Sequence, residues 1–139
     1  MERDPAVGEV WLYPYLWAWQ QDLGETEGRK DRPTAIVAAV HDAEGQLHIA
    51  LLPITSKSPG SDRISMEIPM MEARRIGLTT SHALWIIFDD YNFDAYGESY
   101  YFDPDGRIGA LSSAFLALVT ARFIKALKER AIRRIRRDT

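Results

Sequence analysis

The sequence predicts one small domain of mostly antiparallel β-structure that is closed by a C-terminal helix. Its 139 residues are enough for a single domain and too few for two full ones. Short apolar segments separated by turn residues recur up to about Gly109, which is typical of β-strands. From Leu111 the apolar residues follow a helical spacing instead. We therefore expect β-structure over about residues 8–109 and a helix over about residues 111–136.

The clearest strand patterns lie in the first half of the chain. Val10–Trp17 is rich in β-branched and aromatic residues and is interrupted by Pro14, so we expect an edge strand or a bend at that point. Residues 20–33 are polar, contain two glycines and predict a long exposed loop. Thr34–Val40 and Leu47–Pro53 are apolar runs joined by the turn sequence HDAEGQ, which predicts a β-hairpin.

The middle of the chain predicts shorter elements. Thr55–Arg63 combines Ser, Pro, Gly and charged residues and predicts a loop, whereas Ile64–Ile68 alternates apolar and polar residues as a half-buried strand does. Met70–Gly77 fits one or two helical turns that end at a glycine C-cap. Ala83–Phe88 is a fully apolar strand candidate, and Pro104–Gly106 indicates a later turn.

The last segment carries the helical pattern. Ser112 or Ser113 can cap its N-terminus. An apolar stripe runs along it, at Phe115, Val119, Phe123, Ile124, Leu127, Ala131 and Ile135. We expect the arginines of the last two turns to form a solvated helix end, where positive charge suits the helix dipole. A nucleic-acid contact and a membrane-surface helix are the alternatives.

Charge is unevenly distributed along the chain. There are 17 Lys and Arg against 20 Asp and Glu, a net charge of −3, but residues 122–139 hold eight basic and two acidic side chains. The preceding residues therefore carry a net charge of −9, which argues against a dedicated nucleic-acid-binding domain. The absence of cysteine excludes disulfides, thiolate metal sites and a cysteine nucleophile. Neither a secretory signal nor a transmembrane helix is expected, so we expect a cytoplasmic protein with no membrane partner.

Three segments in the first sixty residues resemble the MazF/PemK family of toxins. They are GEVWLYPY at 8–15, GRKDRPTAIV at 28–37 and LLPITSKSP at 51–59. In that family, a strand that begins Gly-Asp/Glu-Val is followed by a loop ending in Arg-Pro, by an apolar strand and later by a Pro-x-Thr strand end. The order and spacing of these elements carry the resemblance. The segments IPMMEARRIGL at 68–78 and DDYNFD at 89–94 fit it more loosely.

The resemblance implies both a fold and an activity. The fold is an SH3-like or CcdB-like antiparallel β-barrel with a long C-terminal helix. The activity is metal-independent cleavage of single-stranded RNA by a homodimer that a cognate antitoxin neutralises, with no cofactor. Such a reaction needs a base for the 2′-hydroxyl proton, cationic or hydrogen-bonding groups for the charge of the phosphorane, and an acid for the leaving 5′-oxygen.

The resemblance also implies catalytic residues. Arg32 matches the family's catalytic arginine, and Pro33 biases its backbone to an extended conformation. Because a guanidinium has a pKa above about 12, we expect Arg32 to stabilise charge before it donates a proton. Thr55 matches the threonine at the strand end, with an ordinary turn-initiating threonine as the alternative. Glu25 and Glu27 are both candidates for the base, and a solvated loop charge is the alternative for each.

Further polar residues are candidates for substrate contacts. They are Arg29, Lys30, Ser56, Lys57, Asp90 and Asn92. For the basic residues the alternative is ordinary surface charge. For Asp90 and Asn92 the alternative is a turn in which the side chains bond to the backbone.

The aromatic residues and the histidines are better explained by structural roles. Four Trp and six Tyr could stack on unpaired bases, but we expect most of them in the core. Trp11, Tyr13 and Tyr15 should share one face of the first strand, with Leu12 on the other. The three histidines lack metal-ligand spacing, so no metal is expected.

A competing function uses the same fold. It is either a protein-directed inhibitor, such as a CcdB-like gyrase poison, or an RNA-binding module without cleavage. The acidic body of the chain favours this alternative, because it repels RNA unless several basic residues cluster on one face. Those residues are Arg29, Lys30, Arg32, Arg74 and Arg75.

Overall fold

The computed structural model describes residues 4–78 and 81–137. Its strands, in chain order, are β1 (Glu9–Tyr13), β2 (Arg32–His41), β3 (Leu47–Thr55), β4 (Ser65–Ile68), β5 (Leu84–Ile87), β6 (Asp90–Ala95), β7 (Arg107–Ala110) and β8 (Arg133–Arg136). Its helices are α1 (Ala18–Asp22), α2 (Met70–Ile76), the short 3₁₀ turn η1 (Tyr96–Glu98) and α3 (Ser113–Lys128).

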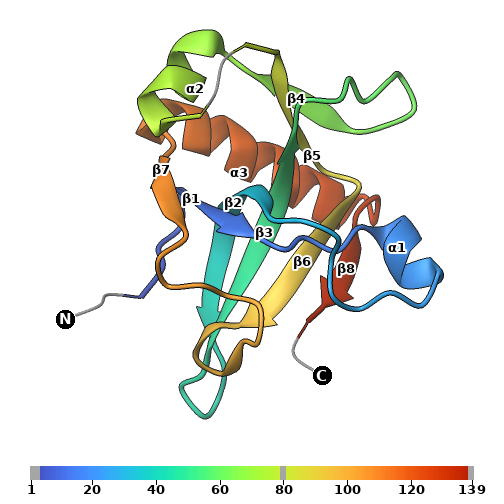
Figure 1. Cartoon of the computed structure of the whole chain (residues 1–139), viewed down its shortest axis with the longest axis vertical. Coiled ribbons are helices and arrows are strands. Elements are labelled where there is room, and N and C mark those ends of the chain that lie inside the picture. The colour runs from blue at the N-terminus through green and yellow to red at the C-terminus, as the bar shows by residue number, and fades with distance from the viewer. Residues whose placement is uncertain (1–3, 79–80, 138–139) are drawn as a thin grey trace.

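The described strands form a single curled, mostly antiparallel sheet. The order is β4-β5-β3-β2-β1-β7, and β6 pairs with the first half of β3 and with β8 (Figure 1). Only the pairing of β6 with β8 is parallel among the described strands. α3 crosses one face of the sheet and α2 lies at one end of it (Figure 1). The predicted class, mostly antiparallel β-structure with helices, is confirmed at this level.

Two hydrophobic clusters fill the two faces of the sheet. The first lies between the sheet and the helices, where Leu52 packs with Phe115 and Val119 of α3. The second is aromatic and contains Trp11, Tyr13, Tyr15 and Trp17 on the opposite face. Leu12 is 42% exposed, so the predicted division of the faces of the first strand is confirmed.

The C-terminal helix ends earlier than predicted. α3 begins after the predicted N-cap, where the Ser112 hydroxyl accepts a hydrogen bond from the Phe115 N–H, but it stops at Lys128 and not near residue 136. The Arg130 N–H then bonds to the Leu127 carbonyl and the next N–H to the carbonyl of residue 126, which together form a Schellman motif. Arg130 has a φ of 54°, a left-handed conformation normally taken by glycine. The sequence carries no glycine to mark this end.

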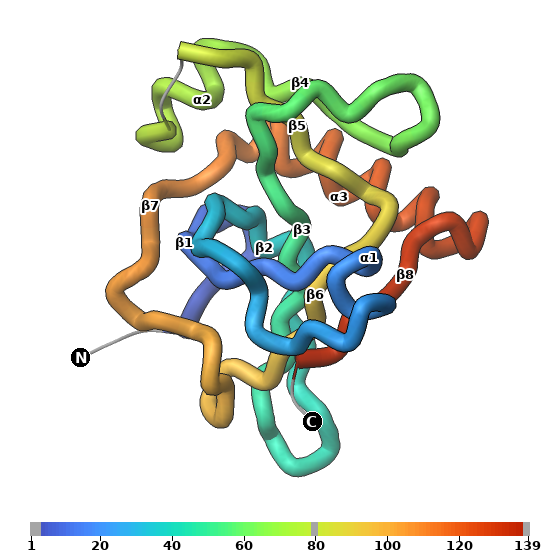
Figure 2. Tube along the Cα trace, turned by 45° about the vertical axis from the view of Figure 1, so that its right-hand side comes forward, coloured from blue at the N-terminus to red at the C-terminus, as the bar shows by residue number. Residues whose placement is uncertain are grey.

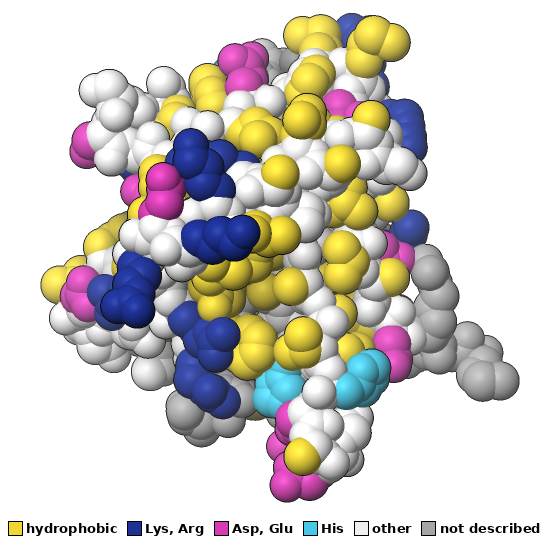
Figure 3. All heavy atoms as spheres, turned by 180° about the vertical axis from the view of Figure 1, so that it is seen from behind, with side chains coloured by type: hydrophobic (Ala, Val, Ile, Leu, Met, Phe, Trp, Pro, Cys, Tyr) yellow, Lys and Arg dark blue, Asp and Glu magenta, His cyan; other side chains and the backbone are white. Residues whose placement is uncertain are grey.

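The basic segment after α3 is built into the protein. Residues 133–136 form β8, which lies beside β6 and α1 (Figure 2). Arg133 forms an ion pair of 2.9 Å with Asp22. The buried Arg137 guanidinium donates hydrogen bonds to the Pro14 carbonyl, to the Asn92 amide oxygen and to a loop carbonyl at residue 26. The predicted helix is therefore wrong for these residues, but the predicted solvation holds for Arg133, Arg134 and Arg136, which are exposed, and fails for the buried Arg137. Lys and Arg side chains gather along one edge of the back face (Figure 3).

Two other predictions are corrected, and one strand was not predicted. Residues 20–33 are not wholly an exposed loop, because Gln20 is buried in α1. β1 is not an edge strand, since it pairs with both β2 and β7 and ends just before Pro14. The acidic and aromatic segment 89–97 is mainly the buried strand β6. The predicted hairpin, the strand at 64–68 and the α2 helix with its Gly77 C-cap are confirmed.

Among the helices of the described residues, none combines the length and the apolar character that crossing a bilayer requires.

Replacing Arg130 by glycine should stabilise the protein. Glycine takes the left-handed conformation without the Cβ clash, and part of this gain is offset by the greater freedom of glycine in the unfolded chain. We expect Arg130→Gly to raise the free energy of unfolding by about 0.5–1 kcal/mol, measured by urea denaturation. Arg130→Ala is the control, because it removes the same side chain and keeps the clash. Equal stabilities of the two variants would contradict this interpretation.

Candidate functional site

The pairing of β2 with β3 brings the two principal candidates together. Thr34 of β2 lies opposite Pro53 of β3. The described pairing ends at these two residues, and continuing its register by two positions, back along β2 and forward along β3, would set Arg32 opposite Thr55. Residues directly opposite each other in antiparallel strands project to the same face, with Cβ atoms about 4.5–5.5 Å apart. By this alternation the side chains of Arg32 and Thr55 belong to the aromatic face of the sheet, and both line one cavity there.

A β-bulge in β2 makes this alignment possible. The register shifts by one residue between Ile36 and Ala38, so that Val37 and Ala38 both pack against the first hydrophobic cluster. Without this extra residue, the register of the hairpin would set Arg32 opposite Ser56. Because side chains alternate along a strand, Thr55 would then project from the other face.

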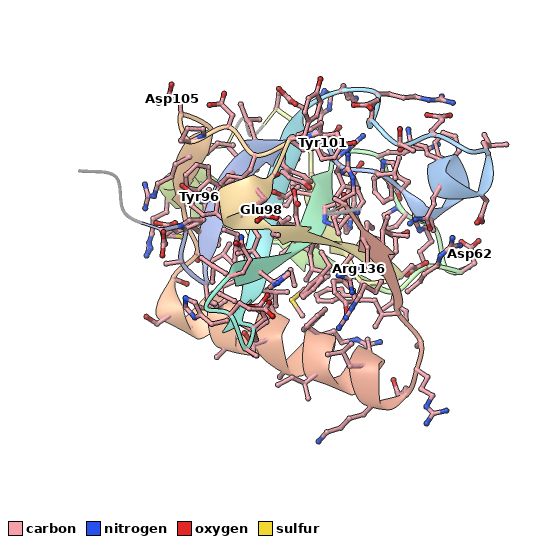
Figure 4. All side chains as sticks on the ribbon, turned by 90° about the horizontal axis from the view of Figure 1, so that it is seen from below. Asp62, Tyr96, Glu98, Tyr101, Asp105 and Arg136 are labelled. Carbon is pink, nitrogen blue, oxygen red and sulfur yellow. The ribbon has the colours of Figure 1, made fainter. Side chains whose placement is uncertain are left out.

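A cavity of about 580 Å³ opens at this end of the sheet. The loop 56–64 and α1 project on the same side of the molecule and flank it (Figure 1), and Asp62 also lies on the α1 side (Figure 4). It is lined by Trp17, Trp19, Lys30, Asp31, Arg32, Pro33, Ile54, Thr55, Ser56, Lys57, Ser58, Pro59, Asp62, Arg63, Leu84 and Ile87. Four of these side chains are basic and two are acidic, so the lining is positive although the chain as a whole is negative.

Arg32 is half-buried in this cavity. Its guanidinium carbon lies 5.0 Å from the centroid of the Trp17 ring. Burial lowers the pKa of Arg32 below its ordinary value, but a guanidinium remains charged at neutral pH. The Nε atom is buried and has no hydrogen-bond partner among the described residues. A buried cationic donor without a partner favours an anionic ligand.

Thr55 has a hydroxyl that is oriented by its own loop. The hydroxyl oxygen accepts a hydrogen bond of 3.1 Å from the Lys57 N–H. This is the turn geometry of the alternative interpretation, and it leaves the hydroxyl proton available for a ligand. Ser56 and Lys57 line the same cavity.

The two candidate glutamates lie elsewhere. Glu25 and Glu27 line a separate cavity together with Tyr101 and Arg136, both labelled in Figure 4. Glu25 forms an ion pair of 2.6 Å with Arg29, and this hydrogen-bonded partner lowers the pKa of the glutamate. The structure therefore does not bring either carboxylate to Arg32.

The remaining basic candidates divide between neighbouring hollows. Lys30 lines the main cavity and also an adjoining smaller one, which contains Arg29. Arg29 lies over the Trp19 ring, 4.8 Å from its centroid. Arg74 and Arg75 are on α2 and do not line either hollow.

Asp90 and Asn92 project into the protein interior. Asp90 accepts hydrogen bonds from the Tyr15 hydroxyl and from the Ala18 N–H, and burial raises the pKa of Asp90. The Asn92 side chain accepts from the Leu16 N–H at 2.9 Å and donates to the Leu16 carbonyl at 2.8 Å. Both residues bond to the backbone, as the alternative interpretation expects, but from a strand and not from a turn. They hold the segment that leads to Trp17.

Sequence reasoning did not single out several of the residues that line the cavity. They are Trp17, Trp19, Asp31, Asp62 and Arg63. Asp31 directly precedes Arg32, so its place near the cavity could have been predicted from the sequence. Asp62 and Arg63 belong to a loop whose composition shows only that it is a loop, and nothing in the sequence relates that loop to Trp17 in space.

No protein-family model matches this chain, and no curated protein matches its sequence. Within the described residues, no group of three or more His, Cys, Asp or Glu side chains is arranged to hold a metal ion. The site is therefore described by its own geometry alone.

Replacing Asn92 by alanine should destabilise the fold. The substitution leaves both polar backbone groups of Leu16 and one Arg137 hydrogen bond without a partner in the interior. We expect a loss of about 2–5 kcal/mol in the free energy of unfolding. Gln21→Ala is a matched control, because that amide bonds to Arg133 at the surface, and it should lose less than about 1 kcal/mol. If Asn92→Ala unfolds like the parent protein, its role is not structural.

Proposed function

We propose that this protein is the toxin of a type II toxin–antitoxin system and cleaves single-stranded RNA without a metal ion. The observation that carries the proposal is the convergence of Arg32 and Thr55, the two residues that match the MazF/PemK pattern, in one positively charged cavity. These residues are 23 positions apart in the chain. The β2–β3 pairing brings their positions together, and what supports a functional role is that the buried Nε of Arg32 has no partner among the described residues and that the Thr55 hydroxyl lines the same cavity.

The chemistry follows from the donors that the cavity offers. Arg32 would bind the reacting phosphate and stabilise the charge that develops on the phosphorane. The Thr55 hydroxyl, whose oxygen is already engaged by Lys57, would donate a hydrogen bond to a phosphate oxygen. Asp31 and Asp62 are the carboxylates that line the cavity, so one of them would take the proton of the 2′-hydroxyl.

The remaining parts of the proposal come from the resemblance. The curled antiparallel sheet would be an SH3-like or CcdB-like barrel, and the active form a cytoplasmic homodimer neutralised by a cognate antitoxin. The sheet topology is compatible with such a barrel.

A second candidate function is binding of RNA without cleavage. The observation that favours it is the location of Glu25 and Glu27, which line a different cavity from Arg32. If the family's loop carboxylate is one of these residues, and neither Asp31 nor Asp62 takes its place, the cavity would keep its basic side chains and its affinity for RNA but would lack the base.

Replacing Arg32 by alanine should abolish most of the RNA cleavage. Loss of one charged donor at the phosphorane lowers kcat by about 10²–10³-fold in comparable sites. Thr55→Val keeps the shape of the side chain and removes the hydroxyl, and it should lower kcat by about 10–100-fold. Cleavage of a mixed-sequence RNA, followed by gel electrophoresis, measures both. Lys125→Ala on α3 removes a positive charge away from the cavity and is the control; full activity of Arg32→Ala would refute the proposed site.

The identity of the base can be tested with four matched amide substitutions. Asp31→Asn and Asp62→Asn each remove one carboxylate from the cavity, whereas Glu25→Gln and Glu27→Gln remove those of the neighbouring one. The variant that lacks the base should lose about 10²–10⁴-fold in rate and the corresponding limb of the pH–rate profile. We expect this variant to be one of the two aspartates. A larger loss in either glutamate variant would mean that the loop moves to Arg32 when RNA binds.

A further inference from the structure

A second guanidinium shares the cavity with Arg32. Arg63 projects from the loop between β3 and β4, and its guanidinium carbon lies 5.1 Å from the centroid of the Trp17 ring. The guanidinium carbon of Arg32 lies 5.0 Å from the same centroid. The two carbons therefore cannot be more than about 10 Å apart. One nucleic-acid strand lying in the cavity can contact both.

Asp89 fixes the position of Arg63. Its carboxylate accepts a hydrogen bond from the Arg63 Nε at 3.3 Å and one from the Ile64 N–H at 2.7 Å. The carbonyl of Asp89 in turn accepts the Arg133 N–H at the start of β8. The ion pair uses only the Nε of Arg63, and its two terminal Nη groups bond to no described residue. They are available to a ligand in the cavity.

Trp17 is a fixed contact that the two arginines share. Its side chain is only 7% exposed and belongs to the aromatic cluster, so its ring is fixed by the core. Both guanidinium groups lie against this ring, and cation–π contacts of this kind hold an arginine in place without neutralising its charge.

The positive charge of the cavity favours an anionic ligand. Lys30 and Lys57 add to the two arginines, against only Asp31 and Asp62. Planar guanidinium forks match phosphate oxygens, and two fixed forks match a chain of phosphates better than a single anion.

We infer that Arg63 is a second phosphate-binding residue. Arg32 would hold the phosphate that reacts, and Arg63 would hold a neighbouring phosphate of the same single strand, with Asp89 as its positioning residue. This inference rests on the proposed function for the roles of the two phosphates. The predicted affinity for single-stranded nucleic acid does not depend on cleavage.

Binding to an uncleavable strand tests the inference. We would titrate a mixed-sequence 2′-O-methyl RNA, in which the attacking hydroxyl is blocked, and measure the dissociation constant by fluorescence anisotropy at several salt concentrations. Each phosphate contact on a single strand contributes about 0.7 to the slope of log K against log salt. Arg63→Ala should weaken binding about 5–20-fold and lower this slope by about 0.7. Lys125→Ala should change neither quantity.

Two further measurements guard against indirect effects. Arg63→Lys keeps the positive charge but loses the planar guanidinium and its hydrogen bond to Asp89. It should retain the salt dependence of the parent protein and weaken binding less than Arg63→Ala does. Asp89→Asn should weaken binding while circular dichroism and urea denaturation report whether the variant is folded. For RNA that is cleaved, Arg63→Ala should raise KM more than it lowers kcat, whereas Arg32→Ala should mainly lower kcat.

The outcomes separate the two proposals. If the parent protein binds the 2′-O-methyl strand and Arg63→Ala binds it equally well with the same slope, the inference is wrong and the cleavage proposal stands. If Arg63→Ala binds weakly as expected but no RNA is cleaved, the inference stands and the nuclease proposal fails. Polyglutamate, an acidic polymer without phosphates, is added as a competitor. If it does not displace the bound 2′-O-methyl RNA, the site is selective for phosphates. Binding of polyglutamate alone, with the same dependence on Arg63, would assign the cavity to an acidic protein segment and overturn the inference.

Discussion

The site depends on a single extra residue in β2. The bulge at Val37 shifts the pairing of β2 with β3 by one position, and only the shifted register sets Arg32 and Thr55 on the same face. Both sides of the bulge are held by burial, since Ile36 packs in the aromatic cluster and Val37 in the cluster beneath α3. The alignment of the two functional residues is thus enforced by hydrophobic packing several residues away from them.

The wall of the cavity opposite the strands depends on a buried polar network. Asn92 binds both backbone groups of Leu16, and Arg137 bridges Asn92 to the Pro14 carbonyl and to the loop before Arg32. These bonds join the N-terminal segment, β6 and the end of the described chain. They orient Trp17, against which both cavity arginines lie. Because a buried polar network is stable only when its members are paired, it favours one arrangement of this wall.

Part of the fold and of the site was predictable from local patterns. The hairpin, the Ser112 cap and the Gly77 helix end are specified by neighbouring residues, and the structure confirms all three. Arg32 and Thr55 were identified by short motifs. The end of α3 was missed because Arg130 takes a conformation that usually requires glycine, and β8 was missed because its one apolar residue, Ile135, also fits the apolar stripe of a longer helix.

The amino-acid sequence by itself determined the class of fold, the approximate positions of β2, β3, β4 and β5, and the two residues around which the candidate site forms. Those features depend on turn residues, on the period of the apolar pattern and on motifs, all of which act over a few positions. Only the tertiary structure decided that Arg63 joins Arg32 at Trp17, that Glu25 and Glu27 do not, and that Arg137 of the basic segment is buried and bonds to the protein interior. These outcomes depend on contacts between segments far apart in the chain, and such contacts produce no periodic pattern in the sequence of either segment.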